Sequence, residues 1–242
     1  MKYVFGNWKM YLDYEESVAL AKTLVAMPIP DDIRVAVFPS FLATVAVGDM
    51  LAKTEIALGA QNCSWAPKGA YTGAVSALQL KEVGCQYVLV GHSERRHIFG
   101  ETDTAVRKKI EAAFDVGLIP IVCVGETKEE KASDKRQYRL KKQLMKVFEG
   151  LDMVAKEIIV AYEPVWAIAS GEPCSPADAE DVLGWIRLEL AKYTSRTVPT
   201  IYGGSVEAKN VLLYTALPSV DGVLIGTMSI KQETFAAILR AL

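Results

Sequence analysis

The sequence has few of the residues that commonly bind metals or form disulfides. It contains two histidines and four cysteines among 242 residues. The cysteines are widely spaced, and no two of them form a Cys-x-x-Cys pair: Cys63, Cys85, Cys123 and Cys174. No carboxylates lie at metal-ligand spacing near the histidines. We therefore expect no disulfide framework and no metal site, with the cysteines reduced and packed as small apolar residues.

The sequence also lacks a strong net charge and a long apolar run. Its 27 basic and 29 acidic residues leave a formal net charge of −2, which gives no general attraction to nucleic acid or to an anionic membrane. No run of about eighteen apolar residues occurs that could span a membrane. Residues 1–10 lack the apolar stretch of a signal peptide. These absences predict a cytoplasmic protein that binds neither nucleic acid nor membrane.

What is present is a regular alternation of short and long segments. Eight short apolar runs rich in β-branched residues are separated by longer stretches with helical periodicity. The predicted strands are 3–5, 34–38, 56–60, 87–90, 119–124, 158–161, 200–202 and 222–225. Apolar strands separated by helices indicate a parallel sheet covered by helices. Eight such units favour an α/β fold with a closed (β/α)8 barrel as one domain over residues 1–242. A doubly wound sheet, with about six strands, is the less natural solution.

Several helix starts are recognisable. Residues 175–178 (Ser-Pro-Ala-Asp) have the order of an N-cap, a first-turn proline and an acidic third residue, and they open a helix expected to reach about Ala191. Asp13 with Glu16 makes a similar start. The charged stretch 128–146 is interpreted as the solvated face of one outer helix. A basic surface for a partner is the alternative, which the interspersed acidic residues disfavour.

In a barrel of this kind the active site lies at the carboxyl ends of the strands. Asn7 and Lys9 follow the first strand, and strand alternation places them on one face with Trp8 on the other. A lysine at this place supplies positive charge for a phosphate dianion and for a developing oxyanion. An ordinary solvated lysine is the alternative interpretation of Lys9.

His92 directly follows the fourth predicted strand and precedes a short polar segment that can become helical. The amino end of a helix disfavours the imidazolium form, so a histidine here can stay neutral and donate a hydrogen bond. The alternative is a structural histidine bonded to a neighbouring loop. His97 is interpreted as structural.

Glu163 follows the sixth predicted strand. A buried carboxylate without a partner is costly, so the side chain is expected to face the barrel mouth. There, partial desolvation is expected to raise its pKa and make it a better base. A salt bridge to Arg95 or Lys9 is the alternative. The following residues, 164–173, have the composition of a mobile lid.

Two glycine-containing turns follow the last two predicted strands. Residues 202–205 read Tyr-Gly-Gly-Ser and residues 226–229 read Gly-Thr-Met-Ser. Glycines allow backbone N–H groups to approach an anion closely, and adjacent strands 7 and 8 are a common place for a phosphate site in barrels. One such turn is a weak signal, but two on adjacent strands predict a phosphate cradle.

Five groups of residues resemble the triosephosphate isomerase family and occur in the family's order along the whole chain. They are 6–10, 59–62 with 69–73, 91–96 with 99–101, 161–168, and 202–206. The resemblance implies an enzyme of glycolysis and gluconeogenesis that interconverts dihydroxyacetone phosphate and D-glyceraldehyde 3-phosphate through an enediolate. It implies no metal and no cofactor.

The resemblance also implies roles for individual residues. Glu163 is the base that moves a proton between two substrate carbons, and His92 is the neutral electrophile that polarises the carbonyl. Lys9 supplies positive charge, Asn7 orients substrate oxygens, and Glu94 lies behind Lys9 as its partner. Backbone groups of four residues are expected to hold the phosphate: Ala169, Ser205, Gly226 and Thr227.

The family resemblance further implies a homodimer. The loop from Asn62 to Ser76, called the dimer loop below, matches the segment by which one family subunit reaches into the other. Thr72 is then expected near Asn7 and Lys9 of the second copy. A tetramer built from such dimers is the alternative that the sequence leaves open.

The sequence departs from the family pattern in three places. Residues 168–171 read Ile-Ala-Ser-Gly where Ile-Gly-Thr-Gly is usual, Thr227 stands where a second glycine is usual, and Ala74 stands where a glutamate is common. None of these changes removes a predicted catalytic side chain. A catalytically silent relative that binds triose phosphates, or another phosphosugar isomerase or lyase on the same barrel, remains the alternative.

Overall fold

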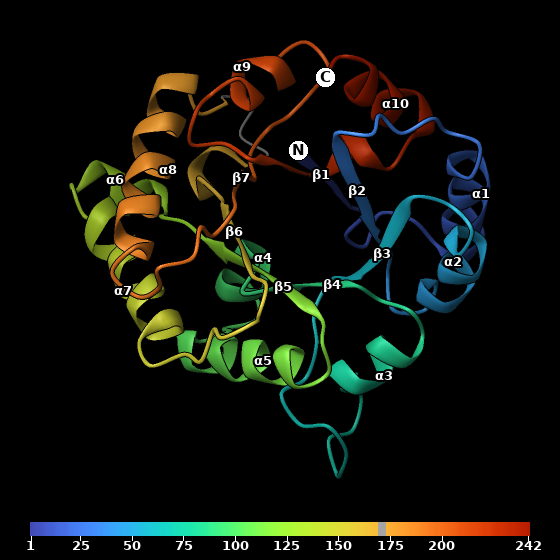
Figure 1. Ribbon diagram of the computed structural model, residues 1–242, viewed down its shortest axis with the longest axis horizontal. Coiled ribbons are helices and arrows are strands. Elements are labelled where there is room, and N and C mark those ends of the chain that lie inside the picture. Colours follow the sequence, from blue (N-terminus) through green and yellow to red (C-terminus); the bar gives the residue numbers. More distant parts are fainter. Residues whose placement is uncertain (169–172) are drawn as a thin grey trace.

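The computed structural model describes residues 1–168 and 173–242. Eight parallel strands close into a barrel in sequence order, with β1 paired to both β2 and β8 (Figure 1). The strands are β1 Lys2–Asn7, β2 Ile33–Phe38, β3 Ile56–Ala60, β4 Tyr87–Val90, β5 Ile119–Val124, β6 Ile159–Tyr162, β7 Thr200–Tyr202 and β8 Gly222–Ile225. The predicted (β/α)8 barrel is therefore confirmed, and β3, β4, β5, β7 and β8 have the predicted bounds.

Helices surround the strands on all sides of the barrel (Figure 1). They are α1 Tyr14–Leu24, α2 Thr44–Leu51, α3 Ala77–Glu82, α4 Ser93–His97, α5 Asp103–Asp115, α6 Lys128–Ala132, α7 Arg136–Phe148, α8 Pro176–Leu190, α9 Val211–Thr215 and α10 Gln232–Arg240. Two short 3₁₀ helices, η1 Val165–Ala167 and η2 Thr227–Ser229, follow β6 and β8. The predicted starts are confirmed, because Asp13 and Glu16 form a reciprocal capping box and the Ser175 side chain caps α8.

The interpretation of residues 128–146 as one helix is wrong. The stretch forms α6 and α7, and the chain between them turns at Asp134, which has a left-handed φ of 56°. The Ser133 hydroxyl donates to the Glu129 carbonyl at 2.6 Å, and the Lys135 N–H donates to the Glu130 carbonyl at 2.8 Å. These bonds close the end of α6, so α7 starts in a new direction.

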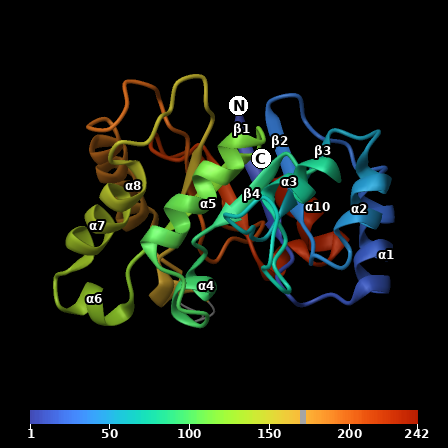
Figure 2. The same ribbon diagram turned by 90° about the horizontal axis from the view of Figure 1, so that it is seen from below.

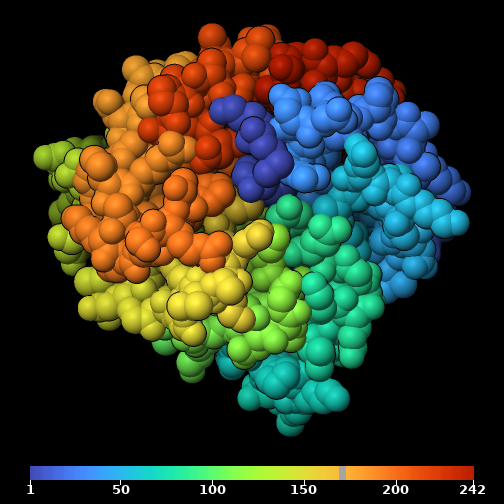
Figure 3. All heavy atoms as spheres, in the orientation of Figure 1, coloured from blue at the N-terminus to red at the C-terminus, as the bar shows by residue number. Residues whose placement is uncertain are grey.

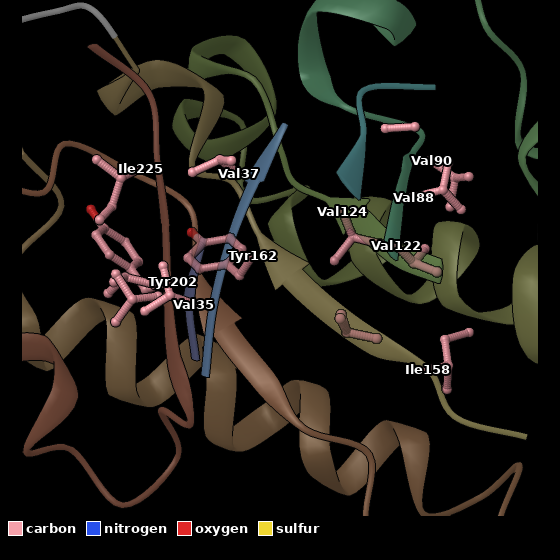
Figure 4. Close-up of a cluster of buried hydrophobic side chains, with 14 of the residues drawn as sticks. Val35, Val37, Val88, Val90, Val122, Val124, Ile158, Tyr162, Tyr202 and Ile225 are labelled. Carbon is pink, nitrogen blue, oxygen red and sulfur yellow. The ribbon is translucent and has the colours of Figure 1, made fainter. Parts of the chain in front are cut away.

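Strand alternation divides the core into two layers. One set of side chains fills the barrel interior, and it includes Phe5, Phe38, Leu89, Ile121 and Ala161. The other set packs between the strands and the outer helices, and Figure 4 shows part of it, including Val35, Val124, Tyr162, Tyr202 and Ile225. Because Ala161 points inward and Tyr162 outward, the next residue, Glu163, points inward again at the barrel mouth.

The cysteines are buried free thiols, as expected. Burial raises the pKa of Cys63, Cys85 and Cys174 to about 12 each. Burial also raises the pKa of Cys123 well above its usual value, with a further contribution from the nearby Glu163 carboxylate. The four thiols are therefore protonated at neutral pH and pack as small apolar groups.

Two features of the outline concern the site and its surroundings. In the side view of Figure 2, α4 lies at the end of the barrel opposite the N-terminus, which is the end where the strands finish. The dimer loop, blue-green in Figures 1 and 3, projects from the body of the molecule.

Within residues 1–168 and 173–242, no helix is long and apolar enough to cross a lipid bilayer.

Candidate active site

Residues from five strand ends line one pocket at the carboxyl end of the barrel. They are Asn7 at the end of β1, Lys9 and Tyr11 after it, His92 after β4, Glu163 and Ile168 after β6, residues 203–207 after β7, and Leu224 with residues 226–228 at β8. The structure thus brings together the predicted residues Asn7, Lys9, His92, Glu163, Ser205, Gly226 and Thr227. Ala169 lies outside the described residues.

The Glu163 side chain is held firmly in place. Its own N–H donates to the Val124 carbonyl at 2.8 Å, which continues the pairing of β6 with β5 by one residue. One carboxylate oxygen, Oε2, accepts the Ser93 N–H at 2.7 Å, and the other, Oε1, lies 2.9 Å from Nε2 of His92. With only 2 % of its surface exposed, the carboxylate is fixed by hydrogen bonds that replace water.

The prediction that the pKa of Glu163 is raised is wrong for this arrangement. Burial does raise the pKa, but the electrostatic interaction and hydrogen bond with His92, the Ser93 N–H and the charge of Lys9 together outweigh burial, so the net pKa is lowered. Held in this way, Glu163 is a stable anion and a weak base. Loss of these donors would raise the pKa of Glu163 and make the carboxylate a stronger base.

The geometry around His92 fits the predicted neutral ring. Its Nδ1 accepts the Glu94 N–H at 3.3 Å in the first turn of α4, so Nδ1 carries no proton and Nε2 is the donor toward Glu163. Burial lowers the pKa of His92, and the Glu163 carboxylate overcomes this and raises it in the present arrangement. If Glu163 moves away, burial, the Glu94 N–H and the charge of Lys9 favour neutral imidazole, against the Glu94 carboxylate, whose Oε2 lies 3.7 Å from Nδ1 and raises the pKa.

Lys9 and Glu94 form the ion pair that the family resemblance implies. The Lys9 ammonium Nζ lies 2.7 Å from Oε1 of Glu94. Arg95 is bonded through Nε to Glu101 at 2.8 Å. The alternative interpretation of Glu163 as the ion-pair partner of Lys9 or Arg95 is therefore wrong, since both cations have other carboxylate partners.

The backbone that carries Lys9 is unusual. Lys9 has a left-handed φ of 52°, which is uncommon for a residue with a side chain and is a strained arrangement that neighbouring contacts must maintain. The Asn7 side-chain oxygen accepts the Lys9 N–H at 3.0 Å. The Gln61 amide donates to the carbonyls of Lys9 at 2.7 Å and of Phe38 at 2.9 Å. Asn7 and Gln61 thus fix the direction of the lysine.

Gln61 is a residue to which the sequence reasoning gave no role. It belongs to a family-like segment and comes directly after the last residue of β3, at the strand end where site residues gather. This position at a strand end was the feature of the sequence that could have marked Gln61 as a site residue. Its two acceptors, however, are backbone carbonyls after β1 and at the end of β2, and no sequence pattern specifies such bonds.

The turn after β7 needs its two glycines for close approach. A Cβ on Gly203 would lie 3.0 Å from Cγ of Glu163, and one on Gly204 would lie 2.1 Å from the Tyr202 hydroxyl oxygen. The next residue, Ser205, donates through Oγ to the Ala167 carbonyl at 3.0 Å. The turn therefore packs directly against Glu163 and is bonded to η1.

The turn after β8 accommodates a side chain at position 227. Thr227 begins η2, and its φ is not in the left-handed region, so its Cβ causes no backbone strain there. The Ser229 hydroxyl donates to the Gly226 carbonyl at 2.7 Å and closes the turn. A Cβ at Gly226 would lie 3.3 Å from Cε of Lys9, so a side chain there would crowd the lysine.

The residues that follow β6 are anchored behind the pocket. The Trp166 indole N–H donates to Oε1 of Glu126 at 2.8 Å, and the Tyr162 hydroxyl donates to the same oxygen at 3.1 Å. Burial raises the pKa of Glu126. The Lys131 ammonium lies 3.4 Å from the centre of the Trp166 ring. Of the predicted lid, the structure describes 164–168 and 173; residues 169–172 are outside the described part of the chain.

In the part of the chain that the structure describes, no group of three or more His, Cys, Asp or Glu side chains is placed to hold a metal ion. The polar groups at the barrel mouth include the buried Glu163 carboxylate, the His92 imidazole, the Lys9 ammonium and two glycine-containing turns, with Glu207 at the rim. This set can remove a proton, stabilise a negatively charged oxygen and bind a phosphate through backbone N–H groups.

Comparison with known proteins gives a consistent result. The sequence model of the family described as triosephosphate isomerase matches residues 2–242. A protein of that name from Dehalococcoides mccartyi is 40% identical over 98% of this chain and 94% of its own length. Those from Moorella thermoacetica and Herpetosiphon aurantiacus are 41% and 44% identical over 98% and 97% of this chain, and over 96% of their own lengths in both cases.

Proposed function

This chain belongs to the triosephosphate isomerase family, and we propose that Glu163, His92 and Lys9 carry its reaction, the interconversion of dihydroxyacetone phosphate and D-glyceraldehyde 3-phosphate. The observation that supports these roles is that a buried carboxylate lies 2.9 Å from a histidine Nε2, in a pocket also lined by a lysine and two glycine-containing turns. The activity is a step of glycolysis and of gluconeogenesis.

The proposed mechanism uses one base and two donors. Glu163 leaves the Ser93 N–H and His92, takes a proton from one substrate carbon and returns it to the neighbouring carbon. The Nε2–H of His92, freed from Glu163, donates to the substrate oxygen on which negative charge develops, and the Lys9 ammonium stabilises the same charge. Asn7 orients the substrate oxygens. Its side-chain oxygen also accepts the Lys9 N–H and so helps to orient the lysine.

Phosphate binding is assigned to the turns after β7 and β8. Backbone N–H groups of Ser205, Gly226 and Thr227 are proposed to surround the phosphate, with Ala169 completing the set from the segment after β6. The enediolate would eliminate phosphate if its carbon–oxygen bond could rotate freely in water. Holding the phosphate in place and excluding water therefore protect the intermediate.

The direct test is a coupled assay that follows both directions of triose phosphate interconversion with the purified protein. In deuterated water, the product should also carry solvent deuterium at the carbon that receives the proton, because a carboxylic acid exchanges with solvent. The catalytically silent alternative gains no support from the described site residues, all of which are present. Binding of phosphate without any conversion would nevertheless establish that alternative.

Thr227→Gly should change the Michaelis constant more than turnover. Thr227 contributes its N–H to the phosphate and has a side chain beside the pocket, where it narrows the approach to the anion. Contacts to phosphate are shared by the ground state and the transition state, so a change in them appears mainly in KM. The measurement is steady-state kinetics with each triose phosphate.

The opposite pattern, a large fall in kcat with KM unchanged, would mean that Thr227 acts on the chemical step. A crystal with a phosphate-bearing inhibitor gives the geometry directly. The Thr227 N–H should lie within about 3.2 Å of a phosphate oxygen. An N–H that points away from the phosphate would remove Thr227 from the site.

We also propose that the chain forms a cytoplasmic homodimer through the dimer loop. The loop carries exposed Trp65 and Tyr71, two large aromatic side chains that gain stability in a pocket on another subunit. Its base is fixed by a 2.7 Å bond from the Ser64 N–H to the Val75 carbonyl. Exposed apolar side chains elsewhere on the molecule are suited to receive it: Met10, Leu42, Ile98 and Phe99.

Light scattering at micromolar concentration should therefore give the mass of a dimer. Ala74 in place of the common glutamate should weaken the dimer only modestly, because burial of the two aromatic rings provides most of the affinity. Tyr71→Asp should shift the protein toward monomer, whereas Tyr138→Asp, on the exposed face of α7, should not. A fully active monomer at that concentration would contradict both the dimer and the proposed place of Thr72.

A further inference from the structure

Tyr214, in α9, makes two contacts that the proposed mechanism does not use. Its hydroxyl donates to the Cys174 carbonyl at 2.6 Å, a bond between residues 40 positions apart. Its ring stacks on Tyr202, with the centroids 4.2 Å apart and the planes 15° from parallel. Both tyrosines are buried, so the hydrogen bond and the stacked pair lie away from solvent.

These two neighbours belong to two different segments of the chain. Tyr202 is the last residue of β7, and the pocket-lining turn 203–205 follows it directly. Cys174 precedes Ser175, the N-cap of α8, and so lies where the chain returns from the segment after β6. A single side chain therefore connects the β7 turn with the chain that enters α8.

The turn after β7 is also bonded to η1, the short helix that follows β6. Ser205 Oγ donates to the carbonyl of Ala167, the last residue of η1, at 3.0 Å. The Asn210 side chain in turn donates to the Ser205 carbonyl at 3.0 Å. The β7 turn thus has one link to η1, through its own serine, and one to the start of α8, through Tyr214.

We propose that Tyr214 is a positioning residue for phosphate binding. By bonding the Cys174 carbonyl and stacking on Tyr202, it sets the position of turn 203–205 relative to the start of α8. It touches no substrate atom. The inference deepens the proposed function and rests on it, since it assigns to Tyr214 the alignment of the backbone N–H groups that hold the triose phosphate.

Alignment matters because backbone donors cannot adjust as a long side chain can. A binding site works when its groups are held to within about 0.5 Å of the productive geometry by surrounding contacts. Tyr214→Phe keeps the stacked ring and removes only the hydroxyl. The buried Cys174 carbonyl oxygen then lacks its hydrogen-bond donor, and the chain at 173–175 must shift to find another donor.

The matched control is Thr215→Val in the same helix. The Thr215 hydroxyl is also buried, but it donates within α9 to the Val211 carbonyl at 3.0 Å, so its hydrogen bond does not connect two segments of the chain. Each substitution removes one buried hydroxyl from α9. A merely structural role predicts that the two variants behave alike.

For Tyr214→Phe we expect KM for each triose phosphate to rise about five- to thirty-fold, which lies within the range for the loss of a buried hydrogen bond. The fall in kcat should be smaller than the rise in KM.

A loosely held phosphate also permits elimination from the enediolate: the carbon–oxygen bond to phosphate breaks, phosphate leaves with the electron pair, and the remaining enol becomes methylglyoxal. The ratio of methylglyoxal to isomerised product should rise in Tyr214→Phe and stay at the wild-type value in Thr215→Val.

Binding of inorganic phosphate, measured by phosphorus NMR, separates this inference from the proposed function. If the wild-type protein does not isomerise triose phosphates, the proposed function fails, yet weaker phosphate binding by Tyr214→Phe than by Thr215→Val would still support the positioning role. If both variants keep wild-type KM, phosphate affinity and product ratio, and lose only thermal stability, Tyr214 is structural and the inference is overturned.

Discussion

Glu163→Gln should leave the barrel folded and lower kcat by about 10² to 10⁴-fold, the range that a general base contributes. The amide has nearly the shape of the carboxylate but cannot take up a proton at neutral pH. One of the two present contacts should also be lost. The amide oxygen can still accept the Ser93 N–H, whereas its NH₂ group then faces the Nε2–H of His92, donor against donor.

Steady-state kinetics and a thermal melt are the measurements for this substitution. The control is Glu189→Gln, which neutralises another buried carboxylate. Glu189 lies on α8, is paired with Lys192 just beyond the helix end and does not line the pocket. Both variants should melt somewhat below wild type, but only Glu163→Gln should lose turnover. Activity of Glu163→Gln within a factor of about three of wild type would place the base elsewhere.

Strand ends explain why much of the site could be predicted from the sequence. In a parallel barrel every strand finishes at the same edge, so polar residues that follow apolar runs converge even when they are far apart in the chain. Asn7, Lys9, His92 and Glu163 could be grouped on this ground alone. Alternation also predicted that Trp8 packs on the other side of its strand, and it lies buried in the outer layer of the core.

The charge state of Glu163 could not be predicted in the same way. The sequence shows that a carboxylate enters a partly buried site, which by itself raises a pKa. The donors that reverse the direction are the Ser93 N–H, 70 residues away, and the His92 ring. Whether such groups point at the carboxylate depends on how β4 and β6 are registered across the intervening β5, and no local pattern specifies that.

Backbone geometry is the other part that the sequence did not reveal. Lys9 and Asp134 both take left-handed φ angles, although neither is a glycine. At Lys9 the unusual angle is maintained by side chains of Asn7 and Gln61, and the latter follows a different strand. At Lys9 a long-range hydrogen bond from Gln61 overrides local preference, whereas the break between α6 and α7 is closed by local bonds at residues 129–135 that no residue type there indicates.

The second large effect is expected from Lys9→Met. A fixed positive charge beside a developing oxyanion typically contributes about 10² to 10³-fold in rate, because it is already oriented when the charge forms. Methionine keeps the unbranched side chain, so the left-handed backbone at position 9 carries no added steric cost. We therefore expect kcat to fall by about that factor and KM to rise, since the same charge attracts the phosphate dianion.

Two comparisons show whether the effect comes from Lys9 itself. Removing the lysine leaves Glu94 beside the pocket without its 2.7 Å partner, and its negative charge repels the anionic substrate. Lys9→Met with Glu94→Gln removes that repulsion, so KM should recover partly while kcat stays low. Lys209→Met removes an exposed charge paired with Glu207 at the pocket rim and should change either constant by less than about threefold. If Lys9→Met behaves like Lys209→Met, the charge of Lys9 stabilises neither the oxyanion nor the phosphate, and His92 alone must stabilise the enediolate.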